Sequence, residues 1–169
     1  MLSRRLLDAL NDQVNYELYS EYVYLAMASY CQSEDLNGLA NFFKVQVQEE
    51  RFHAMKFFDY INQMGGRVFL EGIHQPSNEF ENILDVFEKA LEHEKTVTKR
   101  IYNLSDIALE EKEHATMSLL KWFIDEQVEE EDTFNNIIKK LRRVKDNPAG
   151  LYMLDDELAT RVFTPPANA

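Results

Sequence analysis

The feature that most constrains the fold is an uninterrupted helical pattern from residue 82 to residue 145. Apolar residues recur there at steps of three and four, and the stretch contains neither glycine nor proline. A single helix of that length would be roughly 95 Å long, at about 1.5 Å per residue, which is far too long for this chain. The chain must therefore double back, and we expect the reversal near residues 111–115, although no turn-forming residue marks the place.

Two long helices precede this stretch and a short one follows it. Ser3 suits the N-cap of the first helix, and Gly65 with Gly66 ends the second. Asn147 and Pro148 open the short helix, because proline fits a first helical turn. The expected elements are helices at 3–31 and 39–64, an extended connection at 67–79, two helices within 82–145, a fifth helix at about 147–161 and a tail at 162–169. All belong to one expected domain, 1–169, with its bundle at 3–145.

The composition agrees with an all-α protein and narrows its partners. Five glycines and four prolines in 169 residues are few. The formal charge of −12 disfavours nucleic acid and anionic membrane as partners and favours cations. One cysteine, Cys31, excludes an internal disulfide, and no apolar run approaches the ~20 residues of a membrane helix. Because the N-terminus leads into an amphipathic helix rather than a signal-peptide core, we expect a cytoplasmic protein.

Each of the four long helices has one face that is apolar at most levels and polar in the middle. Steps of three and four place such residues on one side of a helix, as in an antiparallel four-helix bundle. The polar members are Glu17 on the first helix, Glu50 and His53 on the second, Glu94 on the third, and Gln127 and Glu130 on the fourth. The long connection would then cross between the second and third helices.

Antiparallel pairing brings these polar residues to one level. Glu17 and Glu50 are equidistant from a point between residues 33 and 34, inside the expected first turn. Glu94 and Glu130 are equidistant from residue 112, where the length of the helical stretch already demands a reversal. Two independent turns therefore predict a single layer of four carboxyl groups.

Such a layer points to metal ions. Four carboxylates in a dry core are very costly unless cations neutralise them or they take up protons. Two divalent ions balance four carboxylates, and His53 adds one neutral ligand. An oxygen-rich set with one imidazole suits Fe(II) or Mn(II) better than structural Zn(II), which prefers cysteine and histidine. Two interpretations without metal stay open: a polar layer that only sets the register of the bundle, and carboxylates that face solvent.

With this set in place, the chain resembles the ferritins, and most of all the haem-free ferritins of bacteria and archaea. The resemblance rests on Glu17, the Glu50-x-x-His53 step, Glu94 and the Gln127-x-x-Glu130 step, with further local matches at 28–30, 93–101 and 126–131. It spans essentially the full chain, including the long crossover, the short fifth helix and the tail at 163–166. A ferritin-like fold is therefore expected: a four-helix bundle with one long crossover and a short fifth C-terminal helix.

The resemblance also implies roles for individual residues. Glu17, Glu50 and His53 would hold the first iron of a ferroxidase centre, with Glu50 as the bridge, and Glu94 with Glu130 would hold the second. Gln127 would lie beside the pair as a hydrogen-bonding or weakly ligating group, and Tyr24 next to the centre. A third, inner-facing iron site would use Glu49, Glu126 and Glu129, with Glu130 shared. Taken by the residues alone, Tyr24 is better explained as a core aromatic, and the three glutamates also fit a solvated acidic face.

Departures from neighbouring families sharpen the assignment. Bacterioferritins repeat the Glu-x-x-His step on the fourth helix, where this chain has Gln127 and Glu130. They also carry a haem-ligating methionine within the step of the second helix, where this chain has Arg51 and Phe52, so no haem is expected. A complete rubrerythrin would need a cysteine pair, which the chain lacks.

By this resemblance, the protein is expected to store iron: it would oxidise Fe(II) with O₂ and keep Fe(III) as oxyhydroxide inside a homo-oligomeric shell of 24 copies. A second apolar stripe on the first helix supports assembly, because an outer apolar face indicates a subunit contact. Its members are Tyr19, Val23, Ala26 and Tyr30. Two alternatives remain: a soluble di-iron or di-manganese redox enzyme of the peroxidase or catalase type, and a structural helical oligomer.

Overall fold

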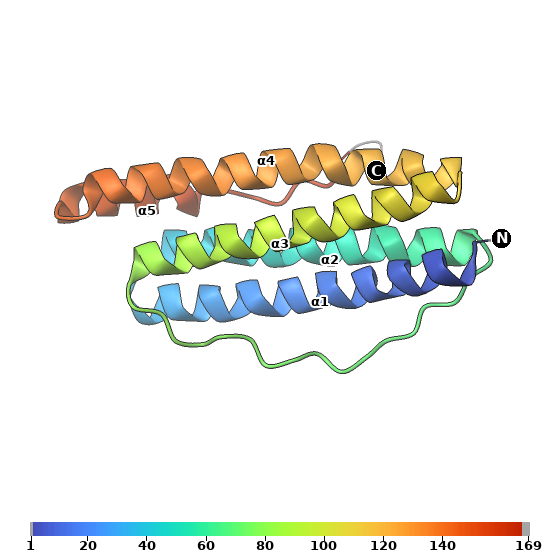
Figure 1. The fold of residues 1–169 in the computed structure, drawn as a ribbon. Helices are drawn as coiled ribbons and strands as arrows, with labels where there is room; N and C mark the ends of the chain where they lie inside the picture. Colours follow the sequence, from blue (N-terminus) through green and yellow to red (C-terminus); the bar gives the residue numbers. More distant parts are fainter. Residues whose placement is uncertain (1, 167–169) are drawn as a thin grey trace.

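The computed structural model describes residues 2–166, which form five helices, turns and one long connection, with no strand in that range (Figure 1). The helices are α1 (Arg4–Ser33), α2 (Asn37–Gln63), α3 (Ile83–Glu110), α4 (His114–Val144) and α5 (Pro148–Ala159). The predicted all-α class and helix order are confirmed, and the predicted helix ends agree to within two residues. Residue 1 and residues 167–169 of the predicted tail lie outside the described residues.

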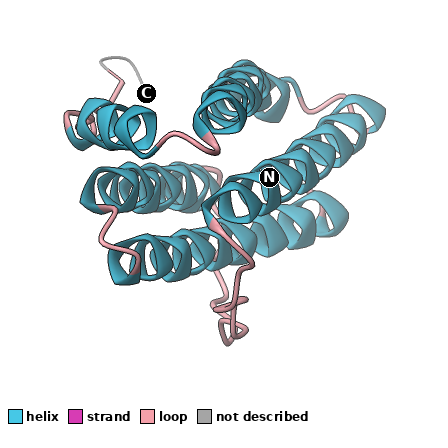
Figure 2. Cartoon of the chain, turned by 90° about the vertical axis from the view of Figure 1, so that its left-hand side faces the viewer, coloured by secondary structure: helices cyan, strands magenta, loops and turns pink. Residues whose placement is uncertain are grey.

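The four long helices lie side by side, and neighbouring helices run in opposite directions (Figures 1 and 2). α1 is antiparallel to α2 and α3, and α4 is antiparallel to α3. The connection from α2 to α3 runs the whole length of the bundle along α1, so α2 and α3 start at the same end. The short helix α5 packs against α2 and α4 at that end.

Both tight reversals use a left-handed residue that is not glycine. Asp35 follows α1 with φ 60°, and Lys112 follows α3 with φ 56°. After α3, the N–H of Glu113 donates to the carbonyl of Ala108 at 2.9 Å, and the same bond pattern closes α1 and α2. Only the end of α2 has a glycine in this position, Gly65 with φ 76°. Hydrogen bonds to the last helical carbonyls thus stop α3 at a place where no residue type announces a turn.

The long connection is held in an extended form by two asparagines of α1. The side chain of Asn11 accepts from the N–H of Phe69 at 2.7 Å and donates to the carbonyl of Arg67 at 3.1 Å. One turn later, Asn15 accepts from the N–H of Glu71 at 2.8 Å and donates to the carbonyl of Phe69 at 2.9 Å. These amides satisfy backbone groups that a neighbouring strand would otherwise satisfy. The predicted extended connection is confirmed.

The apolar core is divided into two clusters, one toward each end of the bundle. All four long helices contribute buried aromatic and aliphatic side chains to both clusters, and α5 adds Leu154 and Leu158 to the first. Representative members are Tyr24, Phe43, Phe87 and Phe134 in the first cluster and Leu10, Phe57, Ile101 and Phe123 in the second. On each helix the polar residues of the predicted layer fall between these two sets, so the apolar clusters enclose the layer from both ends.

The chain beyond α5 turns back along α2. The N–H of Leu39 donates to Asp155 at 2.8 Å, and the side chain of Asn41 donates to the carbonyl of Arg161 at 2.9 Å. α5 approaches the start of α2 so closely that a Cβ on Gly38 would lie 1.6 Å from the carbonyl oxygen of Asp155. A side chain at position 38 is therefore incompatible with this docking.

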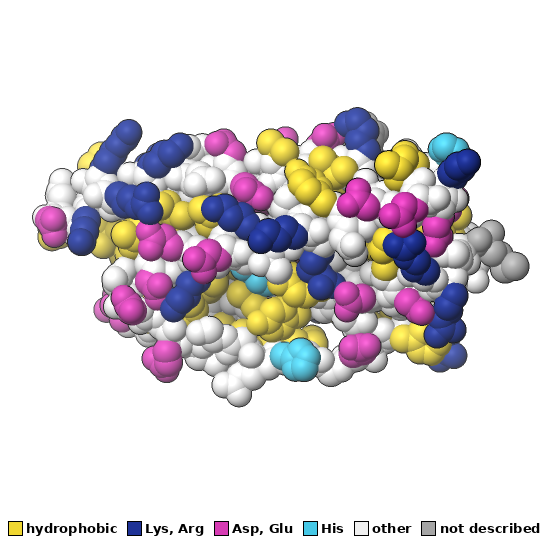
Figure 3. Space-filling model, viewed as in Figure 1, with side chains coloured by type: hydrophobic (Ala, Val, Ile, Leu, Met, Phe, Trp, Pro, Cys, Tyr) yellow, Lys and Arg dark blue, Asp and Glu magenta, His cyan; other side chains and the backbone are white. Residues whose placement is uncertain are grey.

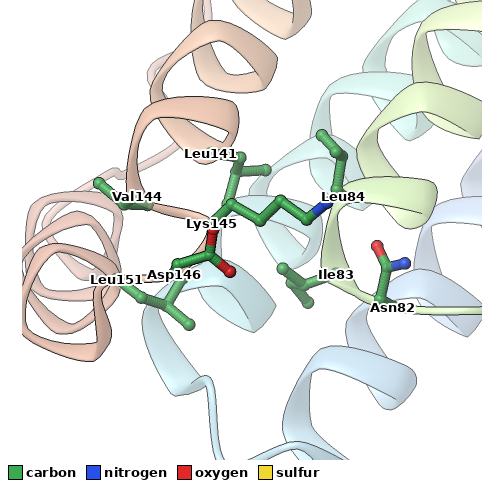
Figure 4. A pocket seen from close by; sticks show the side chains of 8 residues that line it. All are labelled: Asn82, Ile83, Leu84, Leu141, Val144, Lys145, Asp146 and Leu151. Carbon is green, nitrogen blue, oxygen red and sulfur yellow. The ribbon is translucent and has the colours of Figure 1, made fainter.

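A cavity of about 300 Å³ lies at the end of the bundle where α3 begins and α4 ends (Figure 4). Its lining is mostly aliphatic, with polar side chains at Asn82, Lys145 and Asp146. The complete lining is Asn82, Ile83, Leu84, Leu141, Val144, Lys145, Asp146 and Leu151. The cavity therefore borders the first apolar cluster and not the polar layer.

The second apolar stripe of α1 is largely covered by the chain itself. Val23 is buried in the first apolar cluster, and Tyr19 and Tyr30 pack against that cluster. Interpreting Val23 as part of an open outer face is therefore wrong, whereas Tyr19 and Tyr30 are only partly buried. The exposed apolar side chains of α1 are instead Tyr22 and Leu25, which are 45% and 48% exposed.

Charged side chains cover much of the surface. On the face shown in Figure 3, acidic and basic groups lie mixed over the helices, and hydrophobic side chains gather near the middle. No helix of the described chain combines the length and apolarity that crossing a membrane requires.

Candidate metal centre

The middle of the bundle is a buried polar layer to which all four long helices contribute. Its members are the six residues predicted from the helix faces: Glu17 on α1, Glu50 and His53 on α2, Glu94 on α3, and Gln127 and Glu130 on α4. Each is at most 5% exposed. The midpoint at residue 112 falls inside the turn between α3 and α4, and the midpoint at residues 33–34 lies where α1 ends and its turn begins, which is why two antiparallel pairs meet at one height.

Three of the six residues form a compact group. Oxygen atoms of Glu17 and Glu50 and a ring nitrogen of His53 all lie within 4.8 Å of one another. The Nδ1 atom of His53 is 3.5 Å from Oε2 of Glu50, because residues three apart share a helix face. The rings of Trp122 and Phe123 lie edge-on to the imidazole, with centroids 5.6 and 5.8 Å away, and limit its rotation.

Glu94 and Glu130 face the same layer but bind hydrogen-bond donors of their own. Glu94 accepts from the hydroxyl of Tyr24 and from Nε2 of Gln127, the latter at 3.0 Å. Glu130 accepts from Nε2 of Gln46 at 2.9 Å. These donors hold both carboxylates by hydrogen bonds, and neither Glu94 nor Glu130 belongs to the compact group.

Burial controls the protonation of the layer. It raises the pKa of Glu17, and it raises the pKa of Glu50 and Glu130 well above the ordinary value, with a further rise from neighbouring carboxylates. Burial also raises the pKa of Glu94 to about 7. It lowers the pKa of His53 to about 4, so the imidazole is neutral and keeps a lone pair for a metal. Without a cation, all four shifts favour the protonated, uncharged form of these carboxyl groups over the ionised form.

Two carboxylate oxygens in the layer have no hydrogen-bond partner among the described residues. They are Oε2 of Glu17 and Oε2 of Glu50, both fully buried and both in the residues of the compact group. Buried polar atoms are nearly always paired, so unpaired carboxylate oxygens beside a neutral imidazole call for a positive partner. The donor set, oxygen-rich with one nitrogen, fits Fe(II) or Mn(II).

Tyr24 contributes to both the core and the layer. Its ring stacks against Phe43 and Phe134, with centroids 5.9 Å away in each case. Its hydroxyl donates to Oε1 of Glu94. Interpreting Tyr24 as an ordinary core aromatic explains the ring, but the hydroxyl has a partner in the polar layer.

The glutamates expected at a third site lie outside the buried layer. Burial and the charges of Glu129 and Glu49 raise the pKa of Glu126. Glu49 is already paired: its Oε2 lies 2.8 Å from Nη2 of Arg161, whose guanidinium lies over the ring of Phe42 at 4.2 Å. Among the described residues, the ligand atoms of this set do not approach as closely as those of the compact group.

The sequence prediction did not assign any role to two buried glutamines. Gln46 serves Glu130, and Gln13 donates from Nε2 to Oε1 of Glu17 at 2.7 Å. Gln13 lies outside the polar face predicted for the first helix but one turn before Glu17. The spacing of four residues is the signal that would have identified it.

A family model for the ferritin-like domain matches residues 7–144 of the chain. Bacterial non-heme ferritin from Staphylococcus aureus (strain MRSA252) is 47% identical over 163 residues, which cover 96% of this chain and 98% of the relative. Its counterpart from Staphylococcus haemolyticus (strain JCSC1435) is 48% identical over the same shares of the two chains.

Solved structures agree with these sequence matches. An Archaeoglobus fulgidus ferritin engineered into a closed form superposes with a TM-score of 0.95 at 46% identity, over 97% of this chain and all of that one. A humanized archaeal ferritin superposes with a TM-score of 0.96 at 47% identity, over 98% of this chain and all of that one. Both fold and sequence thus match over nearly the whole length.

Proposed function

This chain belongs to the ferritin family, and on that premise we propose that it is an iron-storage protein with its own ferroxidase centre. It oxidises Fe(II) with O₂ in the polar layer of each subunit and keeps the Fe(III) as an oxyhydroxide mineral. Family membership over residues 7–144 supports iron storage. The buried carboxylate layer supports the finer assignment.

The observation that carries the proposal is the pair of unpaired, buried oxygens on Glu17 and Glu50 beside the neutral imidazole of His53. A layer that only set the register of the bundle would be expected to satisfy its own hydrogen bonds. Here the two oxygens have no donor beyond a proton shared between Glu17 and Glu50, and a cation can take the place of that proton. The polar layer is therefore better explained as a binding site than as a structural device.

Each site residue has a role in this proposal. Glu17 and His53 bind the first Fe(II), Glu50 bridges, and Glu94 with Glu130 binds the second. Gln127 holds Glu94 by a hydrogen bond, as does Tyr24 from the other side. Fe(II) binds the deprotonated carboxylates, whose pKa values are raised in the metal-free protein. Fe(II) binding therefore releases protons from the layer.

The reaction is a two-electron reduction of O₂. Each of two Fe(II) ions gives one electron, so that O₂ with two protons becomes hydrogen peroxide. Water hydrolyses the two Fe(III) ions to oxyhydroxide, and four protons are released in the net reaction. The protein contributes fixed ligands that bring the two ions together and that favour the harder Fe(III).

The product must then leave the layer. Glu49, Glu126 and Glu129 form the proposed third site, with Glu130 shared between it and the centre. The charge of Glu49 raises the pKa of Glu130, so the carboxyl groups of these two residues interact. This interaction supports a path for Fe(III) from the centre to the third site. A cation at the third site competes with Arg161 for Glu49. These glutamates are also candidate points for mineral growth.

We place this activity in a homo-oligomeric shell of 24 subunits in the cytoplasm. Family membership supports a shell, and the exposed Tyr22 and Leu25 on α1 offer apolar contact surface. The buried, unpaired thiol of Cys31 agrees with a reducing compartment. Fe(II) and O₂ are the substrates, iron is the metal without haem, and the charge of −12 disfavours nucleic acid and membrane as partners.

Aerobic Fe(II) addition to metal-free protein, followed by gel filtration with iron and protein assays, tests the proposal. We expect far more than two Fe(III) per chain to co-elute with a very large assembly. About two tightly held irons in a small oligomer would instead indicate a di-metal redox enzyme. No retained iron would mean that the layer is structural.

Substitution of the assigned ligands tests the location of the centre. Glu50→Ala and His53→Ala should slow the initial oxidation by more than the roughly 10- to 100-fold that loss of a residue behind a metal ligand costs, because both are direct ligands in this proposal. The matched control is His74→Ala, because His74 is exposed on the long connection. If the Glu50 or His53 variants formed an intact shell and kept the full initial rate of oxidation, the assignment of the centre to these residues would be contradicted.

A further inference from the structure

Gln13 of α1 connects the polar layer with the surface of the bundle. It is 1% exposed, and its Nε2 donates to Oε1 of Glu17 at 2.7 Å. Its other end, Oε1, accepts from Nε of Arg100 on α3 at 3.1 Å. The amide therefore lies between a metal-binding carboxylate and a cation of another helix.

Arg100 is itself held by α1 on several sides. Its Nη2 lies 2.5 Å from the carboxylate of Asp12 and 3.3 Å from the carbonyl oxygen of the same residue. Its guanidinium lies over the ring of Tyr16 at 4.0 Å. Asp12, Gln13, Tyr16 and Glu17 are neighbours on one helix surface, so a single arginine side chain crosses from α3 onto this segment. Such anchoring leaves the guanidinium little freedom to move.

This arrangement determines which way the Gln13 amide points. A guanidinium has only donors, whereas an ionised carboxylate has only acceptors. Arg100 therefore requires the oxygen of the amide, which leaves the nitrogen to face Glu17. The flipped amide would place two donors together at one end and two acceptors together at the other. Arg100 thus orients a hydrogen bond to Glu17 without touching that residue.

The hydrogen bond from Gln13 makes the two carboxylate oxygens of Glu17 different in their surroundings. Oε1 is bound by the amide, while Oε2 has no partner among the described residues. The other donors of the layer act differently, since Gln46 and Gln127 each reach across to a carboxylate on another helix. Gln13 alone among these three is tied to a charged side chain at the rim of the bundle.

We propose that Gln13 and Arg100 are positioning residues that hold Oε1 of Glu17 and present Oε2 to the metal of the Glu17–Glu50–His53 group. The inference rests on the proposed function of that group. Under this proposal, the binding of one metal ion depends on Arg100. This residue is partly exposed and lies on α3, which contributes only Glu94 to the layer.

Anaerobic titration of metal-free protein with Co(II), followed by its visible absorption, tests the inference. Gln13→Leu and Arg100→Met should each weaken one of the two tight Co(II) equivalents by about 10-fold or more, the loss typical of outer contacts in metal sites. Because both residues act through one hydrogen bond, the double variant should bind no more weakly than Gln13→Leu alone. A merely structural role would give additive losses.

Lys99→Met is the matched control, because it removes an exposed cation next to Arg100, while the hydrogen-bond partners of Gln13 are Glu17 and Arg100. Equal weakening in Lys99→Met and Arg100→Met would show that only net charge matters, and would overturn the inference. Unchanged Co(II) binding in Arg100→Met would also overturn the inference. Because Arg100 lies at the rim of the bundle, this variant keeps the test available if Gln13→Leu does not fold. Wild-type protein that binds no Co(II) would instead refute the proposed function itself.

Discussion

Replacing Glu94 by glutamine should stabilise the metal-free protein, and the gain should grow with pH. The pKa of Glu94 is raised from 4.5 to about 7, chiefly by burial. Between these values the folded protein binds more protons than the unfolded chain, so stability falls as the pH rises through this window. Glutamine resembles the protonated carboxyl group in shape and hydrogen bonding, and it carries no charge at any pH.

The size of the gain follows from the difference of about 2.5 between the two pKa values. At about 1.36 kcal/mol for each pKa unit, ionisation of Glu94 costs about 3 kcal/mol at pH 8 and about 0.8 kcal/mol at pH 5. For a chain of this length, about 3 kcal/mol corresponds to a rise in Tm of roughly 6–12 °C. His53 and His93 have lowered pKa values and the opposite pH dependence, but they are the same in both proteins and cancel in the comparison.

Differential scanning calorimetry with a chelator present, at one protein concentration and at pH 5 and pH 8, measures this effect. Glu92→Gln is the matched control, since Glu92 is exposed on the same helix two residues away. If Glu94→Gln gained no more at pH 8 than at pH 5, or no more than Glu92→Gln, the assignment of a buried, repelled carboxylate would be refuted. Added Zn(II) should reverse the order, because the variant keeps the Glu17–Glu50–His53 group but lacks a ligand of the second ion, so that Zn(II) stabilises the unaltered protein more.

Two further substitutions test features outside the layer. Arg161→Gln removes the cation paired with Glu49. A third metal equivalent should then bind roughly 5-fold more tightly, because about 1 kcal/mol of competition from the ion pair is lost. Anaerobic calorimetry measures this change, and the two tight equivalents should stay unchanged. An unaltered third equivalent would contradict the proposed third site. Gly38→Ala should lower the free energy of unfolding by about 3 kcal/mol, because its Cβ meets the Asp155 carbonyl of α5. Gly72→Ala, where a Cβ meets nothing within 4 Å, is the control, and equal thermal shifts in the two variants would contradict the docking of α5.

The sequence was sufficient for the fold because helix periodicity and length are local properties. The absence of glycine and proline over residues 82–145 demanded two helices, and the structure has α3 and α4 there. The turn at Lys112 was located by length and symmetry, not by residue type, since its left-handed conformation is held by backbone hydrogen bonds. The docking of Val23 and of the tyrosines around it was missed, because a helix can bury more than one face when a crossover and a neighbouring helix cover it.

The site divides in the same way. Equal spacing from two turns brought Glu17, Glu50, Glu94 and Glu130 to one level, and the i, i+3 step placed His53 beside Glu50. Nothing in the sequence showed which carboxylate oxygens would be left without partners. That depends on side chains reaching from other helices, as Gln46 reaches Glu130 at 2.9 Å.

The sequence by itself therefore determined the helices, their order and the height of the polar layer. These features depend only on the spacing of residues within each helix and on their distance from the nearest turn. Only the tertiary structure decided how Arg100 orients Gln13, and how Arg161 returns from the end of α5 to pair with Glu49. These contacts join residues 87 and 112 positions apart. They depend on the packing of whole helices against one another, which leaves no periodic trace in the sequence.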